Sequence, residues 1–226
     1  MSERGGRLRL TLFAPLALAA ATAACAEPAP VTRTAHYANG QVWSETRFER
    51  GVPTGRWTTY FEDGTPKSEQ HYAGGLPHGP FRIWYADGSP ASDGTYEHGE
   101  PHGRWRKWYA GGEPQSDEHF RSGVRHGPSK LWYPDGTEYI DCDYADGQPD
   151  GVYREWFPSG QRHRRGAYLR AERHGLWVVW DESGRERQRV QYERGTRDGR
   201  CTYWSADGAV ERERSGVYSR GRKVRD

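Results

Sequence analysis

Residues Gly79–Gly88 read GPFRIWYADG, and the chain returns to this pattern throughout its length. A glycine opens it, an aromatic residue follows two positions later, and a Trp-Tyr pair precedes a closing Asp-Gly. The other copies are Gly55–Gly64, Gly103–Gly112, Gly127–Gly136, Gly151–Gly160, Gly175–Gly184 and Gly199–Gly208. Each copy begins 24 residues after the one before it, with no insertion. A fixed period of this length indicates an array of like units, each packed on its neighbours.

Glycines mark both ends of every copy. The opening glycines are Gly55, Gly79, Gly103, Gly127, Gly151, Gly175 and Gly199, and the closing ones are Gly64, Gly88, Gly112, Gly136, Gly160, Gly184 and Gly208. A third glycine column stands four residues before the opening one and holds Ala171 in one repeat. The closing glycine, as in Ala86-Asp87-Gly88, predicts a hairpin turn, because glycine adopts positive φ at little cost.

Each repeat is expected to form two short strands, such as Arg56–Phe61 and Thr65–Tyr72. A Gly-x-x-x-Gly loop then leads to the next repeat, and we place Pro53, Pro77, Pro101 and Pro149 in that loop because proline disfavours a central strand. No segment has helical apolar periodicity over ten or more residues. The predicted fold is all-β, an elongated single-layer antiparallel meander of about seven 24-residue hairpin repeats.

Aromatic residues form columns along this meander. The first column holds Trp84, Trp108, Trp132, Trp156, Trp180 and Trp204, joined by Tyr60. The second holds Phe48, Tyr72, Tyr96, Phe120, Tyr144, Tyr168 and Tyr192. The chain has 10 Trp and 14 Tyr despite a mean hydropathy of −1.06, which favours a thin sheet with an aromatic buried layer over a disordered chain. Basic residues two positions before the Trp column share its face and are expected to stack on its rings.

The start of the chain differs from the array. Arg4, Arg7 and Arg9 precede an apolar run, residues 10–24, that is short for a membrane span and typical of a signal peptide. We therefore assign residues 1–24 to a signal peptide, residues 25–35 to an extended tether and residues 36–226 to the repeat array.

Two interpretations of the cleavage site stay open. Residues 22–25, Thr-Ala-Ala-Cys, resemble a lipoprotein site in which Cys25 is lipidated, although Thr22 stands where leucine is usual. Alternatively, an ordinary site lies before Glu27. The first predicts an outer-membrane lipoprotein, and the second predicts a periplasmic or extracellular protein.

The remaining cysteines are expected to be free. Cys201 lies five strands after Cys142, which is roughly 24 Å at the usual strand spacing. A disulfide needs Cα atoms about 4.4–6.8 Å apart. We expect two free, mostly buried thiols.

The repeat as a whole resembles the MORN-repeat variant of bacterial proteins, many of which carry the label of a YwqK-type antitoxin. The residues that carry the resemblance are the Gly-x-x-x-Gly loop, the Trp-Tyr-x-Asp-Gly turn and the following Tyr-x-x-Gly, and they extend over nearly all of residues 36–221. The resemblance implies an elongated hairpin array that binds or scaffolds protein partners or membrane lipids. Asp181 and Ser205 depart from the pattern, because they replace the aromatic after Trp.

No catalytic group or cofactor site is predicted. Four loop histidines, His78, His102, His126 and His174, share one column. Equivalent positions in adjacent repeats lie ~10 Å apart, too far for two of them to bind one zinc ion at ~2.0–2.1 Å. We expect these side chains to hydrogen-bond local backbone instead. A one-layer sheet also lacks the buried pocket that acid–base catalysis needs.

Charge is distributed unevenly along the array. Residues 31–160 hold 13 Lys/Arg and 19 Asp/Glu, a net of −6, whereas residues 161–226 hold 17 and 10, a net of +7. The candidate binding residues are the Trp column together with Arg162, Arg164, Arg165, Arg170 and Arg173. In an exported protein these arginines would meet an acidic protein or an anionic envelope surface rather than nucleic acid. A solvated arginine face is the alternative.

Three functions are consistent with these features. The first is a non-enzymatic, envelope-associated scaffold that binds a protein or a membrane. The second is a module that binds glycans or the cell wall through exposed aromatic rings. The third, an antitoxin or immunity protein, rests on the family resemblance alone.

Overall fold

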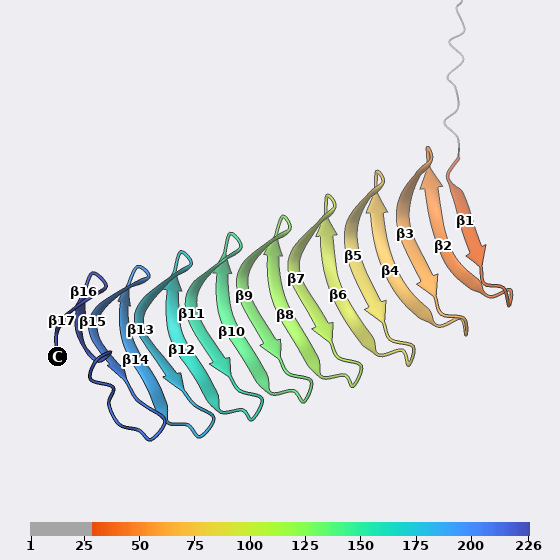
Figure 1. Ribbon diagram of the computed structural model, residues 1–226. Coiled ribbons are helices and arrows are strands. Elements are labelled where there is room, and N and C mark those ends of the chain that lie inside the picture. Colours follow the sequence, from red (N-terminus) through yellow and green to blue (C-terminus); the bar gives the residue numbers. More distant parts are fainter. Residues whose placement is uncertain (1–28) are drawn as a thin grey trace, which may run out of the picture.

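The computed structural model describes residues 29–226, which form one continuous antiparallel sheet of 17 strands (Figure 1). The strands are β1 (Val31–His36), β2 (Val42–Glu49), β3 (Val52–Tyr60), β4 (Pro66–Ala73), β5 (Leu76–Trp84), β6 (Pro90–Glu97), β7 (Glu100–Trp108), β8 (Pro114–Arg121), β9 (Val124–Trp132), β10 (Glu138–Ala145), β11 (Gln148–Trp156), β12 (Arg162–Leu169), β13 (Glu172–Trp180), β14 (Glu186–Glu193), β15 (Thr196–Tyr203), β16 (Gly216–Ser219) and β17 (Arg222–Arg225).

Every strand pairs with its neighbours in the chain, and the edge strands β1 and β17 each pair with one, so the sheet is an open meander. Figure 1 shows the hairpins side by side along a curved ribbon, without a second layer of described residues. The predicted fold class is confirmed. No helix long and apolar enough to cross a membrane occurs in residues 29–226.

The turns at one edge of the ribbon are the predicted Asp-Gly turns. In one of them, Gly88 has φ 81° and donates its N–H to the carbonyl of Tyr85 at 3.0 Å. The carboxylate of Asp87 accepts the N–H of Ser89 at 2.9 Å. A type I turn followed by a glycine in the left-handed region closes such three-residue hairpins.

The turns at the other edge have only two residues, and both adopt positive φ. His98 and Gly99 have φ 51° and 89°, as a type I′ turn requires. In the equivalent turn, Arg170 and Ala171 have φ 51° and 66°.

The placement of the prolines in loops is wrong, because they lie inside strands. Pro77 belongs to β5 and pairs with Tyr72. Its carbonyl accepts the N–H of Gly99 at 2.8 Å from the next hairpin, so the proline still contributes an acceptor to the sheet. The register then shifts between Gln70 and Tyr72, so that a bulge with Gly79 at φ 103° follows the proline.

The sheet also begins earlier than the sequence suggested. Residues 31–35, assigned to the tether, belong to β1, whose residues pair with β2 from Val31↔Phe48 to His36↔Val42. The tether assignment is therefore wrong for these residues. The signal peptide and Cys25 lie outside the described residues.

Tyrosines join each hairpin to the next at the Asp-Gly edge. The hydroxyl of Tyr85 donates to the carbonyl of Trp108 at 2.7 Å, and that of Tyr109 donates to the carbonyl of Trp132 at 3.0 Å. Tyr37 and Tyr133 make the same bond to residues 60 and 156. In the repeat that begins at Gly175, Asp181 replaces the aromatic and accepts the N–H of Arg185 at 3.1 Å.

The last repeat departs from the others and contains the most buried part of the sheet. Residues 205–215 form no regular strand, and Ser215 bonds the backbone of Tyr203 instead. Val190, Cys201, Tyr203 and Tyr218 form a buried cluster there. The edge strand β17 is short and basic, as expected for an edge protected against pairing.

Candidate binding surface

The two faces of the sheet carry different side chains. We call the face that carries the second residue after each opening glycine, which is buried or half-buried in every repeat, the core face. These residues are Trp57, Phe81, Trp105, Ser129, Tyr153, Trp177 and Cys201. We call the opposite face, which carries the predicted Trp column, the ladder face, because side chains alternate from one face to the other along a strand.

On the core face, large rings lie against glycines of the neighbouring strand. A Cβ atom at Gly94 would lie 2.3 Å from the Trp105 ring, and one at Gly166 would lie 2.2 Å from the Trp177 ring. Trp177 is only 3 % exposed, and its Nε1–H donates to the carbonyl of Ala167 at 3.0 Å. The core face is therefore a packed layer that holds the array together.

The ring layer is interrupted in the middle of the array. At Ser129 the small side chain leaves room for Glu118, which is 7 % exposed. The Nε of Arg125 lies 2.7 Å from a Glu118 oxygen, and its guanidinium lies over the Tyr144 ring at 5.5 Å. A charged pair thus takes the place of a ring here.

The predicted Trp column lies half-buried on the ladder face. Arg106, two residues before Trp108, lies over its ring at 5.2 Å, which is the predicted stacking. The rings are neither fully packed away nor fully exposed, so the column alone does not separate a scaffold from a glycan-binding module.

An ion-pair ladder runs beside this column. Strand pairing places basic and acidic residues alternately opposite each other, in the order Arg82, Asp93, Arg106, Asp117, Lys130, Asp141 and Arg154. Arg106 Nε binds Asp93 at 3.0 Å, and Arg154 binds Asp141 at 2.7 Å. The basic members were predicted from the sequence and the acidic ones were not, although the acidic ones also recur every 24 residues. Cross-strand pairs of opposite charge stabilise a sheet.

The ladder breaks at β11–β14. Arg154 lies opposite Arg165, Arg165 lies opposite Val178, and Val178 lies opposite Arg189. Arg189 instead binds Glu186 within its own strand, at 2.9 Å. Like charges directly opposite each other destabilise a sheet, so this stretch costs stability that the earlier rungs provide.

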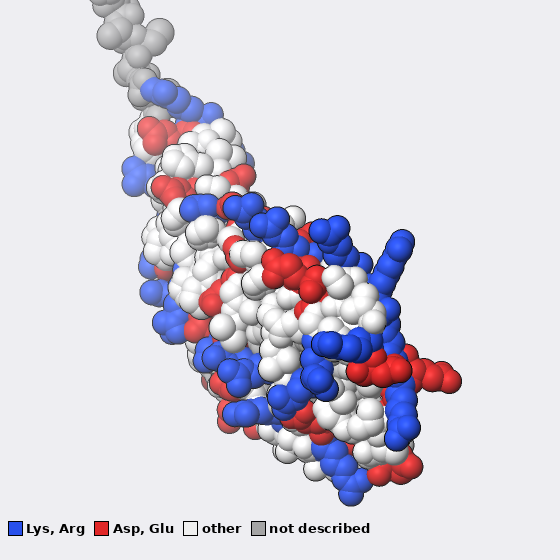
Figure 2. Space-filling model, turned by 90° about the vertical axis from the view of Figure 1, so that its left-hand side faces the viewer, with Lys and Arg blue, Asp and Glu red and all other residues white. Residues whose placement is uncertain are grey.

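A hollow of about 480 Å³ lies over this break. Its lining includes Val152 and Leu176, which are 41 % and 46 % exposed, together with Arg165, Trp180 and Arg189. No acidic residue lines it among the described residues. We call this hollow the ladder gap. Figure 2, which views the molecule from its β17 end, shows many Lys and Arg side chains with fewer Asp and Glu between them.

The structure does not bring the five predicted arginines onto one surface. Arg165 lies on the ladder face, whereas Arg164 and Arg173 lie on the core face and line a separate groove. Arg170 lies in a turn at the edge, where its N–H donates to Asp150 at 3.3 Å. Arg162 pairs with Trp156 at the start of β12, and it lines a smaller hollow of about 100 Å³ together with Arg164 and Arg165.

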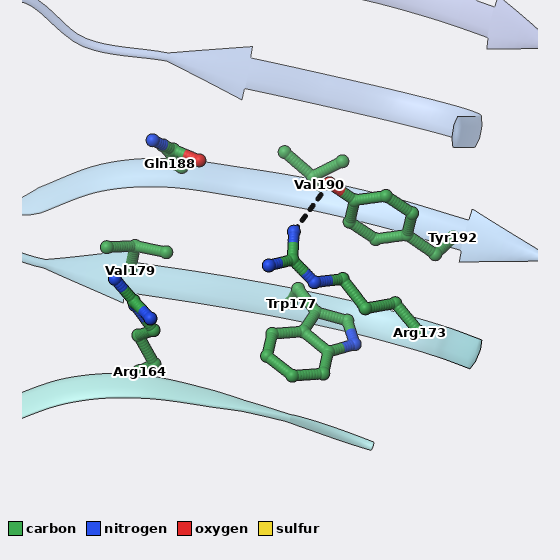
Figure 3. Close-up of a pocket in the computed structure, with 7 residues that line it drawn as sticks. All are labelled: Arg164, Arg173, Trp177, Val179, Gln188, Val190 and Tyr192. Carbon is green, nitrogen blue, oxygen red and sulfur yellow. Dashed lines mark hydrogen bonds between the residues drawn. The ribbon is translucent and has the colours of Figure 1, made fainter. Parts of the chain in front are cut away.

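The groove on the core face has a volume of about 210 Å³ (Figure 3). It is lined by Arg164, Arg173, Trp177, Val179, Gln188, Val190 and Tyr192. Arg173 Nη1 donates to the Tyr192 hydroxyl at 3.3 Å, and the guanidinium lies over the Trp177 ring at 4.9 Å. Arg164 Nη1 lies 3.4 Å from a Glu155 carboxylate oxygen.

The loop histidine column makes local contacts between neighbouring hairpins. His78 Nδ1 accepts the N–H of His98 at 3.3 Å. Asp150 and Asp198 occupy the same column and accept a turn N–H in the same way. His102 Nδ1 lies 3.1 Å from a Glu97 carboxylate oxygen. Within residues 29–226 no cluster of three or more His, Cys, Asp or Glu is placed to hold a metal ion.

Both described cysteines are free and buried, which confirms the predicted thiols. Cys142 is 1 % exposed, and burial raises the pKa of its thiol to about 11. Burial also raises the pKa of Cys201, which is 0 % exposed. Raised pKa values disfavour the thiolate, which is the reactive form of cysteine.

Comparison with known proteins supports the repeat type. The family model described as "MORN repeat variant" matches residues 53–73 and 77–98, which cover most of the hairpins β3–β4 and β5–β6. No curated protein matches the chain at a significant level. The same 24-residue unit continues on both sides of the matched segments. The chain thus carries MORN repeats of the variant type, in two adjacent units of a longer hairpin array.

Proposed function

We propose that the protein is a non-enzymatic, envelope-associated scaffold that holds an acidic protein partner in the ladder gap. The observation that carries this proposal is the break in the ion-pair ladder, where Arg165 faces Arg154 and Val178 in place of a carboxylate. A partner that supplies carboxylates there would complete the interrupted rungs. Exposed Val152 and Leu176 beside the arginine provide the apolar contact of an interface.

The partner's chemistry follows from the lining of the gap. Arginine and tryptophan are the residues that most often anchor protein interfaces, and Arg165 and Trp180 stand together here. An extended segment in which Asp or Glu alternates with apolar residues would place its carboxylates beside Arg165 and its apolar side chains beside Val152 and Leu176. Charge complementarity of this kind gives specificity and a fast association rate.

The envelope location and the absence of catalysis belong to the same proposal. The basic start followed by the apolar run of residues 10–24 supports export, and Cys25 supports a lipid anchor. A single-layer sheet offers no deep enclosed pocket in which a substrate could be held beside paired acidic and basic groups, which disfavours acid–base catalysis.

Glycan binding is the second candidate, favoured by the half-buried Trp180 ring in the same gap. A sugar would stack on exposed ring area and would depend little on the charge of Arg165.

The test uses the full chain without residues 1–25 and a labelled peptide of alternating Glu and Leu. Arg165→Glu should weaken binding at least about five-fold, because it puts a carboxylate where the partner's carboxylate would lie. Arg47→Glu, at an exposed position in β2, is the matched control and should leave binding unchanged. Phosphatidylglycerol vesicles and a neutral glucan oligosaccharide form the other arms. Binding only to vesicles, only to glucan, or to the peptide without dependence on Arg165 would contradict the proposal.

A further inference from the structure

We propose that the groove on the core face binds the carboxylate of a ligand with a short apolar group, such as the free carboxyl terminus of a peptide. This site lies on the opposite face of the sheet from the ladder gap, so the two proposals stand on different residues. Its central group is the guanidinium of Arg173, which Figure 3 shows between Tyr192 and Trp177.

Arg173 is held in place without a carboxylate partner. Its guanidinium lies 4.9 Å from the Trp177 ring centroid and 5.6 Å from that of Tyr192. Its side-chain hydrogen bonds go to the neutral hydroxyls of Tyr192, at 3.3 Å, and Tyr168. Among the described residues no Asp or Glu forms an ion pair with it. Two rings and two hydroxyls therefore orient a cation that has no carboxylate partner among the described residues.

The chain contains its own comparison for this site. Arg125 occupies the same column of the repeat as Arg173, and Glu118, seven residues earlier, binds it at 2.7 Å. Gly166 stands seven residues before Arg173 and offers no side chain. The Arg125 site thus shows that this column accepts a carboxylate, and the Arg173 site lacks the internal one. The Trp177 ring lies against Gly166 and fills the space that Glu118 takes at the other site, so an external carboxylate would reach Arg173 from the groove.

The groove favours a monoanion with an apolar neighbour. Arg164 already shares its charge with Glu155 at 3.4 Å, which leaves Arg173 as the one uncompensated cation of the lining. Val179 forms an apolar wall, and Gln188 lies beside it (Figure 3). A guanidinium binds a planar carboxylate with two parallel hydrogen bonds, whereas a dianionic phosphate would leave one charge unmatched.

The size of the groove sets the size of the ligand. About 210 Å³ is smaller than the 300–1,000 Å³ of most small-molecule sites. It accommodates one terminal residue rather than a long segment. Because Arg173 is exposed to solvent, the expected affinity for a single residue is weak, with a Kd on the order of 1 mM.

The test is a titration of the ¹⁵N-labelled chain without residues 1–25, followed through the indole N–H signal of Trp177. The probe is N-acetyl-leucine at constant ionic strength, and N-acetyl-leucinamide is its neutral counterpart. Binding of the acid with at least about ten-fold preference over the amide is expected, because only the acid bears the charge. Equal binding of both would overturn the proposal, as would tighter binding of inorganic phosphate.

Two variants locate the site. Arg173→Gln should abolish the titration, and Gln188→Glu should weaken it at least about five-fold by placing a competing carboxylate at the rim without disturbing the ring stack. Arg185→Gln removes one positive charge, as Arg173→Gln does, but at an exposed turn nearby, and it should have no effect on the titration. Arg165→Glu should also have no effect, which separates this site from the ladder gap. Unchanged binding in Gln188→Glu would overturn the assignment even if Arg173→Gln fails to fold.

Discussion

Ala171 occupies a backbone position that its counterparts leave to glycine. Its φ is 66°, and a Cβ atom in this left-handed region costs about 1–2 kcal/mol. The neighbouring residue, Arg170, has φ 51°, so the turn holds two side chains where the other repeats have one or none. The turn persists because β12 and β13 pair on both sides of it.

Replacing this alanine should stabilise the protein. Ala171→Gly is expected to raise the free energy of unfolding by roughly 0.5–1 kcal/mol, since relief of the strain exceeds the added entropy of the unfolded chain. Ala73→Gly, at the end of β4, should lower it by a similar amount. Denaturant titration of both variants measures the difference. A loss of stability in Ala171→Gly would show that the turn is not strained.

The buried thiol of Cys142 predicts a specific response to pH. Its pKa is raised from 9.0 to about 11 by burial, so the folded chain holds this proton more tightly than the unfolded chain. The resulting stabilisation is complete below pH 9 and is lost as the pH rises toward about 11. Cys142→Ala should therefore show a shallower fall in the free energy of unfolding over this range. Equal slopes in the two proteins would contradict the raised pKa.

At the scale of the hairpin, the tyrosines of the Asp-Gly turns connect successive units. Tyr109 donates to the Trp132 carbonyl, whereas Phe61 occupies the same column without a hydroxyl. Tyr109→Phe should lower the free energy of unfolding by about 0.5–1.5 kcal/mol, because it removes one hydrogen bond. Phe61→Tyr should add a hydrogen bond to the carbonyl of Trp84 and raise the free energy of unfolding by up to a similar amount. Thermal unfolding of the two variants measures whether the first is less stable and the second more stable than the original protein. Destabilisation by both changes would show that ring packing, not the hydroxyl, dominates.

The hairpins were predictable because their glycines and aromatics repeat without a gap. The ends of the strands were harder to predict. Pro77 lies inside β5, just before the bulge at Gly79, and the low β-propensity of proline disfavours that position. The same bulges set the cross-strand partners, so the ladder gap and the groove could not be found by counting residues along the chain. Arg164 and Arg165 are adjacent in sequence and end on opposite faces, which explains why the arginine cluster separated into distinct sites.

At the scale of the molecule, each hairpin contacts only its neighbours, and the unit length is constant. Deleting residues 65–88 removes one whole unit and joins Gly64 to Ser89. Strand β3 would then pair with β6, and Trp57 would become the cross-strand partner of Gly94 in place of Phe81. The shortened chain should unfold cooperatively and have a maximum dimension about 10 Å smaller in small-angle scattering.

Deleting only residues 65–76 is the matched control. It removes β4, the turn after it and Leu76 of β5, so β5 would have to run opposite to its present direction to pair with β3, and a folded sheet should not form. Equal folding of the two deletions would show that the hairpin is not the unit of the array.

The invariant 24-residue spacing also has a genetic consequence. Unequal crossing-over between two copies of the coding repeat would add or remove whole units while keeping both faces in phase. A single such event would change the length of the repeat array and leave the hairpin fold intact. Natural selection could therefore act on the length of the array directly.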